Sequence, residues 1–75
     1  MNDTNEEIVS KKAHYFYSKE ESIHIDTIKD KFYNGIIIEC SADFIIFQDR
    51  FVGEILIFYS EIRNIEPYKN RGNYD

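Results

Sequence analysis

The fold is decided by the stretch FYNGIIIECSADFIIFQDRFVGEILIFY, residues 32–59. It contains three short runs rich in isoleucine and aromatic residues, at 32–40, 44–48 and 54–59, each bounded by small or polar residues typical of turns. Gly35, inside the first run, predicts a bulge or a sharp bend. Gly53 predicts a turn residue with positive φ. The stretch therefore predicts three consecutive short strands.

These strands are apolar on both faces. The segments 36–38, 44–47 and 55–58 are unbroken apolar runs, whereas a strand with one face in water alternates between apolar and polar residues. Closing such strands into a small barrel buries only their inner face. The outer apolar residues need a helix on one side and another subunit on the other, so the sequence predicts self-assembly.

A helix is predicted ahead of the strands, from about residue 5 to residue 18. Thr4 and Glu7 have the spacing of a capping box, in which each side chain bonds the other residue's backbone N–H. Apolar residues then recur at the helical period and form one face that must pack on the strands: Val9, Ala13, Phe16 and Tyr17.

The period changes from 3.6 to 2 at Ser22, which predicts a first, half-buried strand over 22–27. Lys29-Asp30 predicts the turn after it, since aspartate tolerates the left-handed region better than most residues. After a break at Ser60, residues 61–66 predict a fifth strand. This strand is expected to stop before Pro67, because proline cannot donate to a ladder. The expected domain spans residues 1–67, and residues 68–75 are expected to form a mobile tail.

Length and composition narrow the functional classes. A 75-residue chain forms one domain with a small core, which needs help from a disulfide, a metal or oligomerisation. Cys40 is the single cysteine, which excludes an intrachain disulfide and favours a reducing, cytoplasmic location. The two histidines do not complete a metal set with it, so neither a metal nor a cofactor is predicted. Oligomerisation is therefore the predicted source of the extra stability that the small core needs.

Charge and hydropathy exclude further classes. The net charge of −5 opposes general binding to nucleic acid, which would need clustered cations. Residues 1–7 are acidic and polar, unlike a signal peptide. No apolar run approaches the ~20 residues of a membrane-spanning helix. A membrane is therefore not expected among the partners.

No constellation of catalytic residues is present. His14 and His24 have no cysteine, aspartate or serine partner at a recognisable spacing, and structural or solvated roles are expected for both. Cys40 lies in an apolar strand and is interpreted as a small buried residue rather than a nucleophile. The sequence therefore predicts that the protein is not an enzyme.

The order of one helix and five strands resembles the Sm/LSm superfamily. Ile23 and Ile25 resemble the first strand of the first Sm motif, and the segment 29–37 resembles its turn, aromatic residue and glycine. Gly53 and the fourth strand, followed by Ile62 and Ile65, resemble the second motif. More narrowly, the pattern is similar to uncharacterised Sm-like proteins of phage and archaeal type. The resemblance implies an all-β fold, a small five-stranded SH3/Sm-like barrel with an N-terminal α-helix.

The resemblance also implies a mode of assembly. Sm-like proteins form rings in which the fourth strand of one barrel pairs with the fifth strand of the next. The residues expected at this interface are Ile55, Ile57, Ile62 and Ile65. Such pairing removes both unpaired strand edges at once.

The resemblance is weakest where RNA-binding Sm rings hold their ligand. The loop Ser41–Asp43 is short and lacks the asparagine of those rings, and the fourth-to-fifth strand connection lacks their cation–glycine pair. Single-stranded RNA nevertheless remains the candidate ligand of the pore loops, through Ser41, Asp43, Phe58, Tyr59 and Ser60. The leading hypothesis is thus a non-enzymatic, homo-oligomeric ring. The alternative is a protein-interaction or structural module that binds no nucleic acid.

Overall fold

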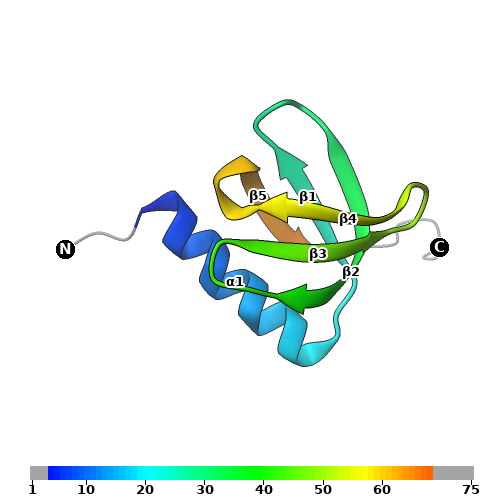
Figure 1. Cartoon of the computed structure of the whole chain (residues 1–75), viewed down its shortest axis with the longest axis horizontal. Helices are drawn as coiled ribbons and strands as arrows, with labels where there is room; N and C mark the ends of the chain where they lie inside the picture. The colour runs from blue at the N-terminus through cyan, green and yellow to red at the C-terminus, as the bar shows by residue number, and fades with distance from the viewer. Residues whose placement is uncertain (1–3, 69–75) are drawn as a thin grey trace, which may run out of the picture.

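One helix precedes five antiparallel strands in the computed structural model, which describes residues 4–68 (Figure 1). Most of the predicted tail, residues 69–75, lies outside this range. The elements in chain order are α1 (Asn5–Lys19), β1 (Ile23–Thr27), β2 (Phe32–Cys40), β3 (Phe44–Asp49), β4 (Gly53–Phe58), the short 3₁₀ helix η1 (Tyr59–Glu61) and β5 (Ile62–Pro67). The predicted architecture of a helix and five strands is confirmed.

The five strands form a single sheet in the order β4-β3-β2-β1-β5. Four consecutive strands are joined as hairpins, and β5 returns to pair with β1 on the far side. The sheet therefore has β4 at one edge and β5 at the other. Because η1 carries the chain directly from β4 to β5, the sheet is rolled and its two edges come near each other (Figure 1).

Helix α1 begins at the predicted capping box. The Thr4 hydroxyl accepts from the Glu7 N–H at 3.1 Å, and the Glu7 carboxylate accepts from the Thr4 N–H at 2.9 Å. Val9, Ala13 and Phe16 are buried as expected. Tyr17, which was expected on the same face, is 42% exposed, because it lies about 100° around the helix from Phe16.

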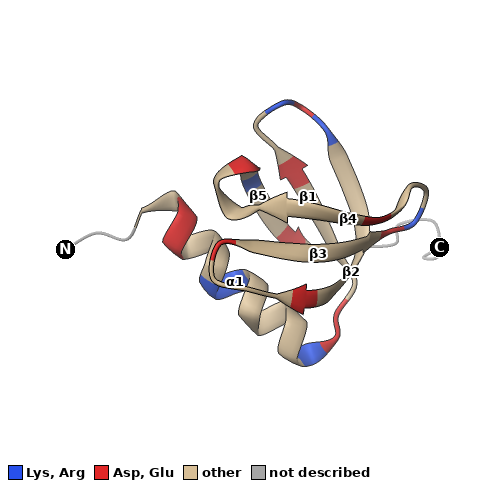
Figure 2. Ribbon diagram, in the orientation of Figure 1, with Lys and Arg blue, Asp and Glu red and all other residues tan. Residues whose placement is uncertain are grey.

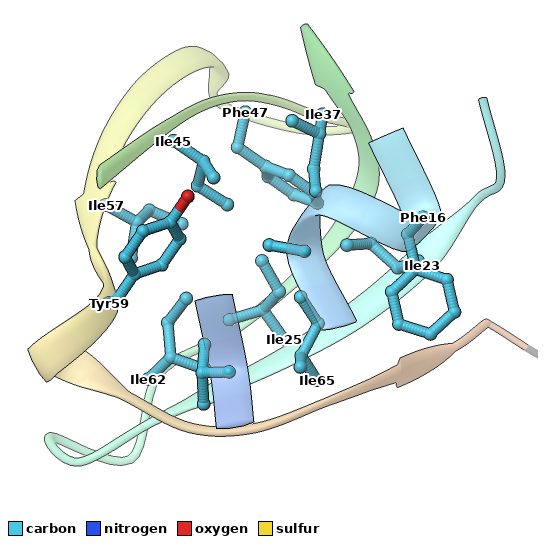
Figure 3. Packing of buried hydrophobic residues seen from close by; sticks show 12 residues of the cluster. Phe16, Ile23, Ile25, Ile37, Ile45, Phe47, Ile57, Tyr59, Ile62 and Ile65 are labelled. Atoms are coloured by element: carbon cyan, nitrogen blue, oxygen red, sulfur yellow. The ribbon is translucent and has the colours of Figure 1, made fainter. Parts of the chain in front are cut away.

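The core lies inside the rolled sheet, where α1 closes it. The largest fully buried side chains are Phe47, Ile23, Ile25, Ile45, Ile62 and Ile65 (Figure 3). The helix contacts β2, β5 and η1, and its buried residues belong to this same cluster. The expectation that the helix would cover outer apolar residues is therefore wrong, since α1 packs on the inner side.

The ends of four strands differ from the prediction by one residue. β1 begins at Ile23 rather than at residue 22. β3 extends to Asp49, and β4 spans Gly53–Phe58 because Tyr59 begins η1 instead. β5 includes Pro67, which pairs with Ile23. The expectation that the strand stops before Pro67 is wrong because β5 is an edge strand, where a residue without an N–H is tolerated.

Asp49 shapes the β3–β4 turn. Its carboxylate is buried and accepts backbone N–H bonds from Asn34, Phe51 and Val52 at 2.8–3.0 Å. Burial alone would raise the pKa of this carboxyl group, but the N–H donors outweigh burial and the pKa is lowered. Gly53 ends the turn with φ of 87°, and Asp30 takes φ of 62° in the β1–β2 turn, as both patterns predict.

Of the two roles predicted for Gly35, a bulge or a sharp bend, the bulge is wrong. The register shift in β2 falls between Ile37 and Glu39, so Gly35 is not the bulge residue. A Cβ atom at Gly35 would lie 1.8 Å from the backbone oxygen of Gln48 on β3. The glycine is therefore required by the close approach of two strand backbones.

Replacing Gly35 by alanine is expected to lower the free energy of unfolding by at least about 3 kcal/mol, since neither backbone can move without breaking the β2–β3 ladder. Gly53→Ala is the matched control: nothing lies within 4 Å of its added Cβ, and only its positive φ is strained, at a cost of about 1 kcal/mol. Urea unfolding measures both. Equal losses in the two variants would contradict the close-approach explanation.

Candidate nucleic-acid surfaces and assembly edges

The structure brings the two predicted pore loops together. The Tyr59 N–H donates to the Asp43 carbonyl at 3.0 Å, and the Tyr59 hydroxyl donates to the Ser41 carbonyl at 2.7 Å. These bonds join the β2–β3 loop to η1. Phe58 and Ser60 flank Tyr59 and are exposed. The sequence-predicted residues therefore form one surface, with Tyr59 beneath it.

Tyr59 itself cannot stack on a base in this conformation, because the residue is only 3% exposed and its ring lies in the core near Ile45 and Ile57 (Figure 3). Its hydroxyl lies 3.3 Å from the Cys40 sulfur. Burial raises the pKa of Tyr59, and the neighbouring Cys40 raises it further. The expectation of a direct RNA contact by Tyr59 is thus corrected: it is a core residue that positions the two loops.

The electrostatics beside these loops oppose a polyphosphate. A hollow of about 350 Å³ lies between the start of α1 and the β2–β3 loop. Three carboxylates line it, from Glu6, Glu7 and Asp43, against the single ammonium group of Lys11.

Phe44 was not singled out from the sequence, but its ring packs edge-on against Phe58, with the ring centroids 6.0 Å apart. The loops thus offer an aromatic pair without a cationic groove.

A second surface, on the outward face of β1, β2 and β5, carries a better stacking platform. The rings of His24 and Phe32 are stacked with centroids 5.8 Å apart and planes 18° from parallel, and Phe32 is 62% exposed. The Asn34 side-chain oxygen lies 2.7 Å from His24 Nδ1. The strand register places Asn64 and Glu66 of β5 beside Asp26 and His24. We call His24, Phe32 and Asn34 the stacking platform.

The stacking platform offers an aromatic face and an amide side by side. Such a pair can stack on a planar base and hydrogen-bond its edge. Strand alternation in the sequence does place His24 on the outer face. The stack was missed because it also depends on the β1–β2 register, which sets Asn34 directly opposite His24 and Phe32 opposite Asp26.

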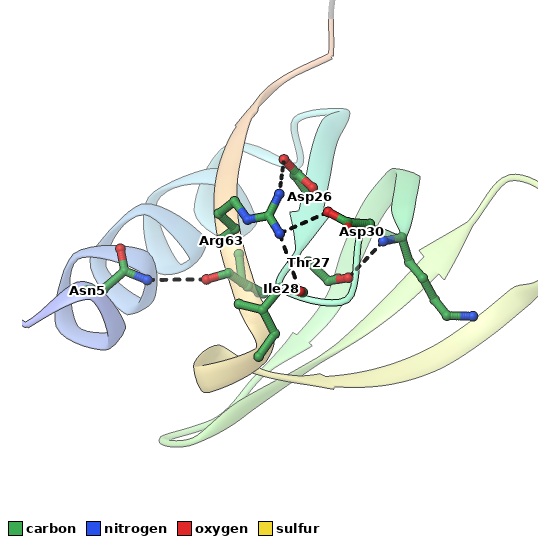
Figure 4. A network of polar contacts seen from close by, with 8 residues as sticks. Asn5, Asp26, Thr27, Ile28, Asp30 and Arg63 are labelled. Carbon is green, nitrogen blue, oxygen red and sulfur yellow. Dashed lines mark hydrogen bonds and ion pairs between the residues drawn. The ribbon is translucent and has the colours of Figure 1, made fainter.

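Arg63 of β5 fixes the β1–β2 hairpin next to this platform (Figure 4). Its guanidinium lies 3.0 Å from the Asp30 carboxylate and 3.7 Å from that of Asp26, and it donates to the Ile28 carbonyl at 3.3 Å. The Thr27 hydroxyl accepts from the Lys31 N–H at 3.1 Å inside the turn. The hairpin is therefore tied to β5 by contacts distant in sequence.

The predicted interface residues lie on the edge strands, but most of their side chains face inward. Ile57, Ile62 and Ile65 are at most 2% exposed, and Ile55 packs partly against the core. Only their backbone groups can take part in pairing between copies. The outward apolar side chains of β4 are Leu56 and Phe58, which are 47% and 43% exposed.

Apolar side chains continue from β4 across the outer face of the neighbouring strands. The β3–β4 register pairs Phe44 with Phe58 and Ile46 with Leu56 on this face. Ile36 and Ile38 of β2 are about 40% exposed. The predicted outer apolar face is therefore present and is uncovered in one protomer. We call Phe44, Ile46, Leu56 and Phe58 the outer apolar stripe.

Residues 4–68 contain neither a candidate metal site nor a helix that could span a membrane. No group of three or more histidine, cysteine, aspartate or glutamate side chains there could hold a metal ion. In the same range, no helix is both long and apolar enough to cross a membrane. Cys40 is a free thiol whose pKa is raised by burial.

Comparison with known proteins identifies the fold. No family model matches the sequence, and neither does any curated protein. Among solved structures, a 1.55 Å crystal structure of Hfq, described as a pleiotropic translational regulator, matches with a TM-score of 0.67. The match covers 79% of this chain and 97% of that chain at 15% sequence identity. The N-terminal helix and five-stranded antiparallel sheet are thus the Sm-like fold.

The buried Tyr59 hydroxyl makes the stability of the protein depend on pH in the alkaline range. Because the pKa of Tyr59 is raised in the folded protein, the unfolded chain releases this proton first. Stability is then fully present below about pH 10 and falls as the pH rises further. At neutral pH, we expect urea unfolding to show that Tyr59→Phe is less stable than the wild type by about 1 kcal/mol. Above about pH 10, the variant should lose less stability than the wild type does. Parallel losses in both proteins would contradict a neutral, hydrogen-bonded Tyr59.

Proposed function

We propose that this chain is a non-enzymatic subunit of a homo-oligomeric ring, in which β4 of one copy pairs with β5 of the next. The observation that carries the proposal is the pair of free strand edges, β4 and β5, at opposite ends of one sheet. Both strands are six residues long, so one can cover the whole length of the other. A head-to-tail contact of this kind builds a ring when the rotations between successive copies add up to a full turn.

The outer apolar stripe supports the same proposal. Leu56 and Phe58 stand on the edge strand itself, beside the position that a neighbouring strand would take. An added strand extends the sheet and covers part of this face. The stripe also supports the alternative of a protein-interaction module, in which a different protein covers it. The mass of the purified particle separates the two.

Single-stranded RNA is the proposed ligand of the ring, and two surfaces are candidates for it. The pore loops offer Ser41, Asp43, Phe58 and Ser60, but the carboxylates beside them disfavour phosphate. The stacking platform has an exposed ring and an adjacent amide, and we favour it. The likeness to Hfq in fold is consistent with RNA but is not the basis of this choice.

Two finer expectations belong to this proposal. A cytoplasmic location fits Cys40, which remains a free thiol. The narrower likeness to phage and archaeal Sm-like proteins stays a prediction from the sequence motifs.

The ring is tested by light scattering on the purified protein at micromolar concentration, where we expect a mass several times that of one chain. Leu56→Glu is expected to weaken assembly about tenfold or more, because it places a charge in an apolar contact. Phe51→Glu is the matched control, since Phe51 is 90% exposed in the β3–β4 turn. A wild-type monomer across the micromolar range would contradict the ring.

RNA binding is tested by titrating oligo-A and oligo-U at low salt. Phe32→Ala is expected to weaken binding about tenfold, the value of one lost base stack. The control is Phe51→Ala, which removes an even more exposed ring outside the stacking platform. Because stacking is expected to supply most of the binding, affinity should depend only weakly on salt. The slope of log K against log salt concentration should correspond to one or two neutralised phosphates, at about −0.7 for each phosphate.

The same titration decides between the two surfaces. A loss of binding in Phe58→Ala with none in Phe32→Ala would transfer the RNA site to the pore loops. No binding by the wild-type ring would favour the interaction-module alternative.

A further inference from the structure

A hollow of about 310 Å³ runs beside the free edge of β4. Residues 55–57 of β4 form one wall. The opposite wall is the β1–β2 hairpin, which contributes Thr27, Lys29, Lys31 and Tyr33, and Glu61 of η1 stands at one end. A strand that pairs with β4 must pass along this hollow. The hairpin side chains would then contact that strand.

The hairpin presents two unneutralised cations to the hollow. The only carboxylate in the turn between β1 and β2, residues 28–31, is that of Asp30, and it is paired with Arg63 at 3.0 Å (Figure 4). Within residues 4–68, Lys29 and Lys31 have no carboxylate partner. Lys29 and Lys31 flank Asp30 at the tip of the hairpin. In Figure 2 this tip is blue on either side of a short red segment. With Glu61 counted, the hollow carries a net positive charge, on a chain whose net charge is −5.

The charge on β5 complements this hollow. The strand has two exposed ionisable side chains, Arg63 and Glu66, and Arg63 is already occupied by Asp26 and Asp30. Glu66 is therefore the group on β5 that an outside cation can pair with. When two six-residue strands pair antiparallel over their full length, the Glu66 end of β5 lies beside the first half of β4, where Ile55 borders the hollow.

Two carboxylates would face each other where β5 of a second copy meets β4, so a cation is needed there. Glu54 is exposed on the first half of β4 and would repel the incoming Glu66 carboxylate. We propose that Lys29 and Lys31 receive the Glu66 carboxylate of a second copy and so lock the β4–β5 contact electrostatically. This inference rests on the proposed ring and assigns residues to its interface.

The test is a charge reversal with rescue, in the full chain at low salt, followed by sedimentation velocity over a concentration series. Lys29→Glu/Lys31→Glu is expected to raise the dissociation constant for assembly about tenfold or more, since like charges then face each other. Lys12→Glu/Lys19→Glu, on exposed positions of α1, makes the same change in net charge and is expected to stay within about twofold of the wild type. Adding Glu66→Lys to the hairpin variant reverses both partners and should restore assembly to within about threefold.

Salt provides an independent readout. Raising the ionic strength from 0.1 M to 1 M shortens the Debye length from about 10 Å to about 3 Å, so the difference between the hairpin variant and the wild type should shrink. Circular dichroism checks that each variant is folded.

The outcomes separate this inference from the ring itself. If the wild type assembles and the hairpin variant assembles equally well, the electrostatic lock is overturned while the ring stands. If Glu66→Lys does not rescue the hairpin variant, Glu66 is not the partner and the inference fails. If the wild type is monomeric, the ring proposal fails and this inference with it.

Discussion

Two free strand edges are the constraint on which the rest of this structure depends. A sheet of five short strands, rolled around a core of about a dozen side chains, buries little surface for a chain of 75 residues. Its first and last strands in sheet order, β4 and β5, leave rows of backbone donors and acceptors unpaired with another strand. The outer apolar stripe adjoins one of these edges. The proposed pairing between copies would satisfy these backbone groups and cover apolar surface in a single contact.

Much of the fold follows from local patterns in the sequence. The capping box at Thr4 and Glu7, the alternation that buries Ile23 and Ile25, and the left-handed turn at Asp30 each depend on neighbours a few residues away. What the sequence leaves open are contacts set by register. Gly35 is explained only by the β3 backbone opposite it, and the stack of His24 on Phe32 only by the pairing of β1 with β2. Periodicity predicts which face a residue occupies, not what stands beside it.

The candidate site differs from the one that the sequence predicts for the same physical reason: local patterns do not reveal which residues become neighbours in the fold. Tyr59 follows an apolar strand, and the sequence predicts a pore residue there, but η1 turns its ring inward, where its hydroxyl donates to the Ser41 carbonyl. The loops it joins lie beside carboxylates from the start of α1, a proximity no local pattern reveals. On the β1–β2 side of the sheet, the exposed ring of Phe32 is accompanied by the cationic side chains of Lys29 and Lys31. The proposed ligand face, the stacking platform, is therefore distinct from the proposed assembly edge, β4.

Hydrogen–deuterium exchange of the edge strands tests the central claim most directly. The β4 and β5 amides that make no bond within the protomer should exchange slowly in concentrated protein and rapidly after dilution below the assembly range. Amides of β2, which is central in the sheet, should be protected at both concentrations and serve as the internal reference. Rapid exchange of the β4 and β5 edge amides at every concentration, with β2 protected, would contradict pairing of these strands between copies.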